Sequence, residues 1–231
     1  MKREKEFKGL NRDMAAFMHE LAANNNKEWF DSNRKRYTEN VREPLKALVA
    51  KMGESFMAND LPYAADTRKA IFRINRDIRF SKNKDPYKNN LGLFFPFTEN
   101  QQVGRSVESL GLYLHYEEKE CFIAGGIHCP IPAMLKNIRE HVSEEFEEFL
   151  ELINSKDLTK NFPQILLGDK LKSMPRGFSK DDPAADYLKH KEFTFLCPIK
   201  HEDIYSKGIE EKLINKGKAL LPILSFLSKT P

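Results

Sequence analysis

The chain has 231 residues, of which 40% are hydrophobic and 31% charged, and its formal net charge is +4. This balance is close to that of an ordinary soluble globular protein, and the net charge alone does not suggest a nucleic-acid partner. Three cysteines without a CxxC pair argue against a disulfide framework and for a reducing compartment.

Neither a secretory signal nor a membrane helix is expected. The N-terminal stretch MKREKEFKGL is basic but lacks the apolar core of a signal peptide. The longest nearly apolar run, ALLPILSFL at 219–227, is too short for a bilayer helix, which takes about 20 apolar residues. We therefore expect a soluble cytoplasmic protein without a membrane partner.

The first sixty residues show the periodicity of amphipathic helices. Apolar side chains at positions 14, 17, 18 and 21 follow the i, i+3, i+4, i+7 pattern of one helical face. The three asparagines at 24–26 can end this helix and cap a second one that begins at Lys27. Pro44 suits the first turn of a third helix.

Between about residues 71 and 131 the pattern changes to that of strands. Three short runs bounded by turn residues are predicted strands: 91–97, 111–116 and 121–127. Pairing Tyr116 with Cys121 across a four-residue loop gathers apolar side chains on one face of a hairpin. The pair Gly125-Gly126 indicates a bulge or a close approach of two backbones.

A long amphipathic helix is predicted over about 132–153, because Pro132 suits its first turn and apolar residues recur along one stripe. Its opposite face carries glutamates and is expected to be solvated. Residues 154–205 look irregular except for a predicted strand at 193–199. A helix from about Ile209 is expected to close the chain.

These elements predict a single α+β domain over residues 1–231, since no linker or repeat divides them. In this fold, N-terminal helices at about 10–60 pack on a mostly antiparallel sheet at about 71–131. The amphipathic helix at about 132–153 follows the sheet, and an irregular part with the C-terminal helix makes up 154–231.

One segment concentrates positive charge. Residues 67–90 carry eight positive and two negative side chains, a local charge of +6. Residues 71–80 are interpreted as a strand, which places Arg76 among apolar side chains and Asp77 on the opposite face with two further arginines. An unpaired buried charge costs several kcal/mol, against a domain stability of about 5–15 kcal/mol. Arg76 must therefore be paired, extend its charged end outwards, or lie at a sheet edge.

Two kinds of partner are possible for these arginines, and a solvated surface without a specific partner is the third alternative. Acids from elsewhere, such as Glu28, Asp31 or Glu140, would make the segment an internal salt-bridge network in a structural or interaction module. Otherwise the segment is a site for an external anion, because guanidinium groups match phosphate or carboxylate oxygens. The expected anion-binding residues are Arg73, Arg76, Arg79, Lys82, Lys84 and Lys88, supported by Asp77, Tyr87 and Trp29.

The ligand of such a site is left open between a phosphate-containing small molecule and a nucleic acid. Bases could stack on Tyr87, Phe80 or Phe94. An alternative is an enzyme that acts on a phosphorylated or nucleic-acid substrate, with Asp77 as base or metal ligand. Trp29 is expected to be a core anchor on its helix. No oligomeric state is predicted.

No metal site or cofactor is predicted. His115, Cys121, His128 and Cys129 lie close in sequence, but their spacing is not that of a zinc knuckle. Strand alternation also sends His115 and Cys121 to opposite faces of the hairpin. Neighbouring side chains in a strand point apart, so His128 is not expected to activate Cys129 as a nucleophile.

The basic segment also resembles a known family. IFRINRDIRFSKNKDPYKNN (71–90) is similar to the central motif of domain of unknown function 2461, and the stretches at 21–37, 111–130 and 171–193 agree with it. This resemblance covers nearly the whole chain. It implies one full-length soluble domain and carries no activity, cofactor or catalytic residue. Its motif positions here are Trp29, Phe30, Arg73, Arg76, Asp77, Arg79, Phe80, Pro86, Tyr87 and Lys88.

Overall fold

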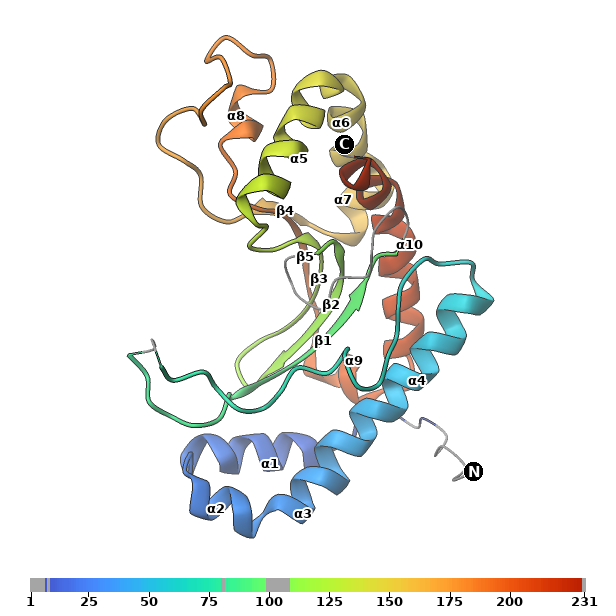
Figure 1. Cartoon of the computed structure of the whole chain (residues 1–231). Helices are drawn as coiled ribbons and strands as arrows, with labels where there is room; N and C mark the ends of the chain where they lie inside the picture. Colours follow the sequence, from blue (N-terminus) through green and yellow to red (C-terminus); the bar gives the residue numbers. More distant parts are fainter. Residues whose placement is uncertain (1–6, 8, 80–81, 99–108, 230–231) are drawn as a thin grey trace.

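The computed structural model has a five-stranded antiparallel sheet at its centre (Figure 1). It describes residues 7, 9–79, 82–98 and 109–229, without the side chain of Leu167. The strands are β1 (Asn90–Pro96), β2 (Gly111–Glu117), β3 (Cys121–Ile127), β4 (Gln164–Leu167) and β5 (Phe193–Pro198). They are ordered β1-β2-β3-β5-β4, and each neighbouring pair is antiparallel.

Helices precede and follow the sheet. The N-terminal ones are α1 (Arg12–Ala23), α2 (Lys27–Ser32), α3 (Arg34–Tyr37), the π-helical turn η1 (Thr38–Arg42) and α4 (Glu43–Ala58). The later ones are α5 (Pro132–Glu144), α6 (Phe146–Ile153), α7 (Lys156–Asn161), α8 (Ala185–Leu188), α9 (His201–Tyr205) and α10 (Ile209–Ser228). This arrangement confirms the predicted α+β class. Within the described part of the chain, no helix has the length and apolar character needed to cross a membrane.

The N-terminal helices begin largely where the sequence indicates. The side chain of Asn26 accepts a hydrogen bond from the backbone N–H of Trp29 at 2.9 Å, which caps α2 at its predicted start. The helix then breaks at Asn33 and passes through α3 and η1 before α4. Pro44 lies in the first turn of α4, as predicted. In Figure 1, α4 and α10 run along one side of the sheet.

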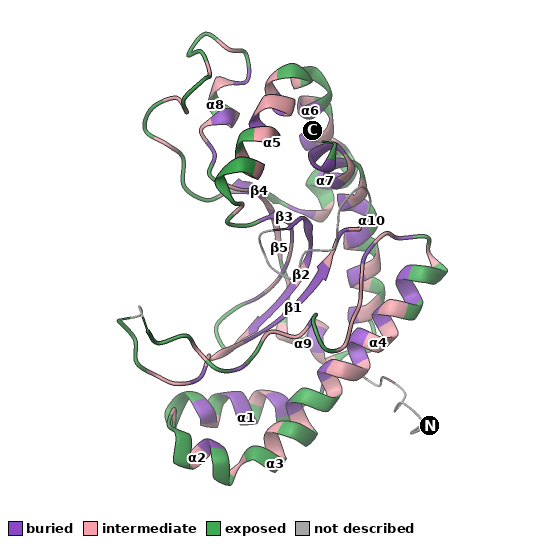
Figure 2. Cartoon of the chain, in the orientation of Figure 1, coloured by how far each residue is buried: buried purple, intermediate pink, exposed green. Residues whose placement is uncertain are grey.

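The apolar face of the β2–β3 hairpin packs against α10. Tyr116 pairs with Cys121 in the predicted register. The side chains expected on this face are all buried: Leu112, Leu114, Tyr116, Cys121 and Ile123. A Cβ atom at Gly125 would overlap the side chain of Leu220 of α10, and one at Gly126 would overlap the backbone carbonyl oxygen of Phe193 of β5. The second contact confirms the predicted close approach of two backbones. Figure 2 shows the buried residues concentrated in the strands and on the helix sides that face them.

The helix predicted over 132–153 is in fact two helices. Glu145 leaves the helical conformation, with φ −114° and ψ 45°, and it separates α5 from α6. Beyond the break, Phe149 contacts Phe193 of β5 and Phe226 of α10. The apolar periodicity continues across the break, which is why the sequence indicated one helix.

The interval 154–205 is less irregular than predicted. It contains the predicted strand as β5, together with α7, β4, α8 and α9. The edge strand β4 has four residues and a register shift between Ile165 and Leu167, where Leu166 has φ +50°. Elements this short hold too few residues for either hydrophobic period to show in a sequence.

Gly125→Ala tests the packing of α10 on β3. The added methyl group would overlap the fully buried Leu220, so we expect the free energy of unfolding to fall by about 1–3 kcal/mol in chemical denaturation. Gly53→Ala is the matched control. Gly53 lies within α4, and its added Cβ would be 3.5 Å from the Cβ of Ala65, an ordinary van der Waals distance. That change should stabilise the protein by roughly 0.5–1 kcal/mol. Equal effects of the two substitutions would contradict this packing.

Candidate functional site

The basic segment 71–90 does not form the predicted strand. Ile71 makes an isolated bridge to Leu93 of β1, and the N–H of Phe72 donates to the carbonyl of Gly92 at 3.0 Å. The chain then leaves the sheet as a long loop near α1 and α2 (Figure 1). The alternating sequence is compatible with an extended chain, but a strand also needs a neighbour that continues the hydrogen-bond ladder.

The two halves of this loop pair with each other over a short distance. The N–H of Arg76 donates to the carbonyl of Pro86 at 2.9 Å, and the N–H of Lys88 donates to the carbonyl of Ile74 at 2.8 Å. Proline fits this position because only its carbonyl group takes part in the pairing, and proline has no N–H to donate. The pairing brings one arginine and one lysine of the predicted site into the same narrow ribbon.

Asn25 fastens this ribbon to the N-terminal helices. Its side-chain oxygen accepts from the N–H of Tyr87 at 3.1 Å. Its amide nitrogen donates to the carbonyl of Tyr87 and to the side chain of Asn89, both at 3.0 Å. The Tyr87 ring stacks on Phe30 of α2, with centroids 4.1 Å apart and planes 19° apart. The sequence indicated only a capping role for the asparagine run.

Two of the three rings considered as platforms for nucleic-acid bases are buried and not available for stacking. Tyr87 is 4% exposed and faces α2, and Phe94 is 6% exposed. Phe80 lies outside the described residues. Trp29 packs on the core with its ring centroid 5.6 Å from that of Phe17, which agrees with its predicted role as an anchor.

Asp77 is engaged by Arg79. Its carboxylate oxygens accept from Nε and Nη2 of Arg79 at 3.0 and 2.7 Å, and from the backbone N–H of Arg79 at 3.2 Å. These hydrogen bonds lower the pKa of Asp77 to about 2. Nη2 of Arg73 is farther away, 4.0 Å from the same carboxylate. The single aspartate therefore balances Arg79 far better than Arg73.

Arg76 and Lys88 have no carboxylate within 4.0 Å among the residues that the structure describes. Nε of Arg76 is buried without a hydrogen bond, and its Nη2 reaches the carbonyl of Tyr87 only at 3.5 Å. Nζ of Lys88 lies 5.6 Å from the ring centroid of Phe72. Burial lowers the pKa of Lys88, and the positive charges of Arg73 and Arg76 lower it further. We call Arg73, Arg76 and Lys88 the cationic cluster.

The acids that were expected to balance the arginines lie elsewhere. Asp31 pairs with Arg34, and Glu140 pairs with Lys136. Glu28 is exposed and makes no ion pair within the described ranges. The internal salt-bridge network, as predicted with these acids, is therefore not formed.

The remaining predicted residues do not join the cluster. Lys82 and Lys84 are exposed near the tip of the loop. Nζ of Lys84 donates to the carbonyl of Ile78 at 2.9 Å. Arg79 is held by Asp77, so three of the six predicted cations converge and three do not.

Aromatic residues of the sheet adjoin the cluster, and sequence reasoning did not connect them with it. The ring of Phe72 lies against Tyr113 of β2, with centroids 5.7 Å apart, and the Tyr113 hydroxyl is 3.0 Å from Nδ1 of His115. Nε2 of His115 is buried and lies 3.6 Å from a carboxylate oxygen of Glu117, slightly beyond hydrogen-bond distance. Burial lowers the pKa of His115. Only the strand register, which pairs Gly92 with His115, brings these groups together.

A shallow depression of about 300 Å³ between β5, α7 and α10 is a weaker candidate. Its lysines are already satisfied: Nζ of Lys216 donates to the carbonyl of Asn161 at 2.6 Å, and Lys212 pairs with Asp203 at 2.9 Å. Both ammonium groups in the lining thus have a hydrogen-bond or ion-pair partner, whereas the cationic cluster holds a buried guanidinium nitrogen with none among the described residues.

Comparison with known proteins agrees with the resemblance carried by the basic segment. A family model described as a conserved hypothetical protein, domain of unknown function 2461, matches residues 13–226. The chain belongs to this family. The matched range includes every residue of the cationic cluster and Asn25. The description of domain of unknown function 2461 assigns no activity, and no significant match was found among curated proteins or solved structures.

The Asp77 carboxyl group should titrate at about pH 2 when followed by carbon NMR. Because this pKa is depressed in the folded state, the stability from the pair is present above the ordinary carboxyl pKa and is lost as the pH falls towards 2. Arg79→Gln should return the pKa towards its ordinary value. Arg73→Gln, at 4.0 Å, should shift it less. An ordinary pKa in the unaltered protein would contradict the contact.

Proposed function

We propose that this protein binds a phosphate-like anion at the cationic cluster. The supporting observation is the half-buried guanidinium of Arg76, whose Nε has no hydrogen-bond partner and which lies near Arg73 and Lys88 without a described carboxylate to balance it. An uncompensated, partly desolvated charge costs up to several kcal/mol, a large share of a domain stability of about 5–15 kcal/mol. An anion bound among the three groups removes this cost.

The three cations favour an anion that has several oxygens. Each guanidinium presents a planar fork that binds two oxygens at once, and the ammonium of Lys88 acts as a compact third charge. A carboxylate has two oxygens and cannot serve two forks and an ammonium together. A phosphate group or phosphate ester has enough acceptor oxygens for all three.

The surroundings favour a small phosphorylated molecule over a nucleic acid. Proteins that bind single strands stack bases on accessible aromatic rings, whereas Tyr87 and Phe94 are buried. The rings beside the cluster are the half-buried Phe72 and Tyr113, which can contact the organic part of a small ligand. The exposed Lys82 adds long-range attraction for an anion.

The geometry gives little support to catalysis by Asp77. A group with a pKa of about 2 is a weak proton acceptor near neutral pH, and both of its oxygens accept from Arg79. The enzyme hypothesis therefore stays a prediction from the sequence.

A purely structural role for the segment accounts for one part of it. The contacts of Tyr87 with Asn25 and Phe30 hold the loop against the N-terminal helices. Among the described residues, the charged ends of the cluster make only long contacts, so a structural role explains them less well.

Phosphate titration tests the proposal. At constant ionic strength, replacing chloride by inorganic phosphate should raise the free energy of unfolding, by about 2.7 kcal/mol when phosphate reaches 100 times its Kd. Arg76→Gln should remove most of this gain, because it deletes the partly buried guanidinium of the cluster. Isothermal titration calorimetry on the same proteins gives the Kd.

Arg176→Gln is the matched control for this titration. Arg176 is an exposed arginine between β4 and α8, so its loss changes the net charge equally without touching the cluster. This variant should keep the full response to phosphate. The proposal is wrong if phosphate does not stabilise the unaltered protein. It is also wrong if phosphate raises the free energy of unfolding of Arg76→Gln by the same amount.

A further inference from the structure

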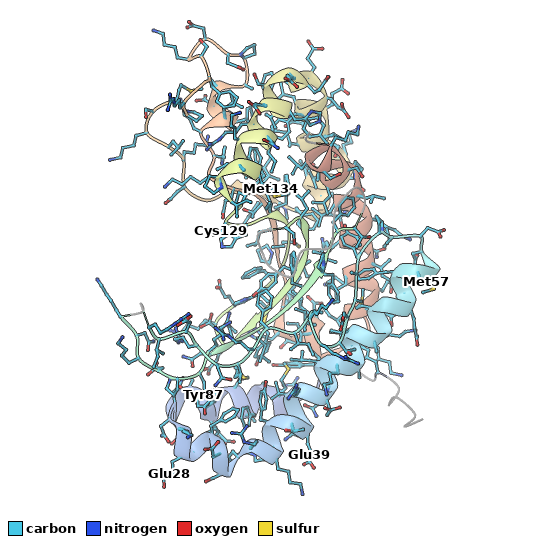
Figure 3. All side chains as sticks on the ribbon, viewed as in Figure 1. Glu28, Glu39, Met57, Tyr87, Cys129 and Met134 are labelled. Carbon is cyan, nitrogen blue, oxygen red and sulfur yellow. The ribbon has the colours of Figure 1, made fainter. Side chains whose placement is uncertain are left out.

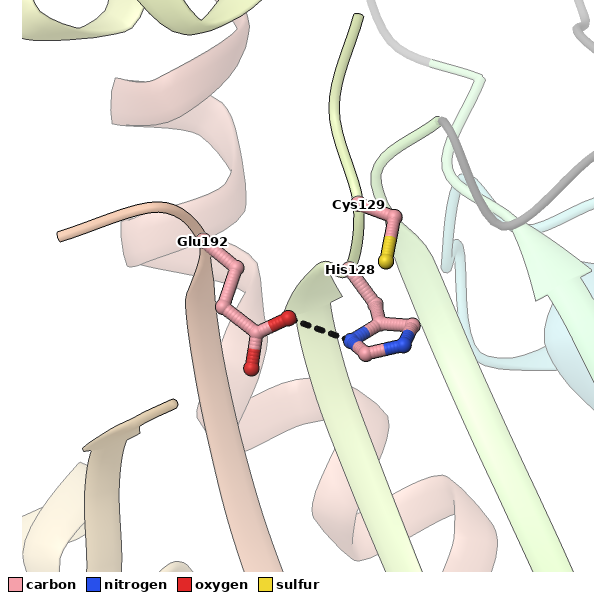
Figure 4. A group of neighbouring side chains, drawn as sticks. All are labelled: His128, Cys129 and Glu192. Carbon is pink, nitrogen blue, oxygen red and sulfur yellow. Dashed lines mark ion pairs between the residues drawn. The ribbon is translucent and has the colours of Figure 1, made fainter. Parts of the chain in front are cut away.

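A second group of reactive side chains lies where β3 ends and β5 begins. His128 and Cys129 follow β3 directly, and Glu192 directly precedes β5. The pairing of Ile127 with Phe193 puts these two ends side by side. One imidazole nitrogen, the thiol sulfur and one carboxylate oxygen all lie within 4.8 Å of one another (Figure 4).

The backbone at Cys129 explains how two neighbours in sequence can meet. Cys129 has φ +52°, in the left-handed region that residues other than glycine seldom adopt. It lies beyond the last residue of β3, so strand alternation does not apply to it. The expectation that the side chains of His128 and Cys129 point apart is therefore wrong, and Figure 4 shows the thiol beside the imidazole.

Glu192 is held in place from its other side. Its side chain is only 16% exposed, and the hydroxyl of Thr194 donates to Oε1 at 3.3 Å. A Cβ atom at Gly168 would overlap this carboxylate, so the glycine leaves room for it. The second oxygen, Oε2, contacts Nδ1 of His128, whose side chain is 60% exposed. The carboxylate is thus aimed at the imidazole before any ligand arrives.

We propose that His128, Cys129 and Glu192 form a binding site for Zn²⁺. Zinc takes thiolate, imidazole and carboxylate ligands at about 2.0–2.3 Å, which sets ligand atoms roughly 3–4 Å apart around one ion. Donor atoms within 4.8 Å of one another reach this spacing through small side-chain rotations. The ion would replace the direct contact of imidazole and carboxylate, and the thiol would release its proton to solvent as its sulfur binds.

The donor set also indicates the kind of metal and the type of centre. A thiolate with an imidazole favours Zn²⁺ and its substitute Co²⁺ over Mg²⁺ and Ca²⁺, which prefer all-oxygen sites. Three protein ligands leave the fourth tetrahedral position for water or an external ligand. Because His128 and Cys129 are exposed, solvent can reach that position.

This site does not rest on the proposed anion binding. Gly126, near the zinc site, pairs with Gly111 at the start of β2. The opposite end of β2 pairs with Asn90, next to the basic segment. The two sites are thus at opposite ends of the strands, as the positions of Tyr87 and Cys129 show in Figure 3, and either proposal can fail without the other.

Cobalt titration tests the zinc site. The full chain, freed of any histidine tag and of metal, should bind one Co²⁺ with the near-ultraviolet band of a thiolate–cobalt bond, and Zn²⁺ should abolish this band by displacement. Cys129→Ser should lose the band. Glu192→Gln should weaken binding by more than about tenfold, since even groups that only orient a ligand contribute about 10–100-fold.

Two further variants separate this site from other donors. Cys197→Ser removes a half-exposed cysteine of β5 and should leave the band unchanged. His115→Asn alters the other candidate group, formed with Glu117 and Glu120, and should also have no effect. Absence of binding, a band that survives in Cys129→Ser, or binding lost only in His115→Asn would each overturn the proposal. Circular dichroism shows whether each variant is folded. If Cys129→Ser does not fold, Glu192→Gln still tests the proposal.

Discussion

The hydrogen bonds between the Asn25 amide and the backbone of Tyr87 are the contact on which the candidate site depends. The amide satisfies both the N–H and the carbonyl of a nearly buried residue, and each of these groups would cost about 1–3 kcal/mol if left unpaired. Tyr87 precedes Lys88 in sequence and pairs with Asn75, the residue before Arg76, in the ribbon. Fixing Tyr87 against Phe30 therefore also fixes where the cations of the cluster meet.

Charge balance decides between a structural and a binding role for the cluster. The exposed pair of Asp77 and Arg79 resembles the surface ion pairs that contribute little to the stability of a protein. Arg76 and Lys88 carry a cost instead, because they are partly desolvated and repel each other without a described acid nearby. This unfavourable charge repulsion does not stabilise the fold. Local conflicts of this kind are characteristic of functional sites.

The sequence predicted the elements that have a long or repeated pattern. The helices α1 and α10, the β2–β3 hairpin with its register, and the α+β class follow from hydrophobic periods and turn residues. The break at Glu145 and the short β4 carry no such pattern. At the site, the basic residues were found by composition, but the burial of Tyr87 and the commitment of Asp77 to Arg79 depend on tertiary contacts. The grouping of His128 and Cys129 depends on one left-handed residue that no sequence signal marked.

The most direct test is the pKa of the Lys88 ammonium, because this pKa depends on the charges around it. It can be measured by NMR of the side-chain carbon or nitrogen, with Lys88→Arg used to assign the signal. In chloride it should lie below the ordinary lysine value, because of burial and of the charges of Arg73 and Arg76. Saturating phosphate should raise this pKa. An anion that binds the charged form of Lys88 more tightly than the neutral form must, by linkage, make the lysine harder to deprotonate. An ordinary pKa in chloride, or a lowered one that phosphate leaves unchanged, would contradict the account.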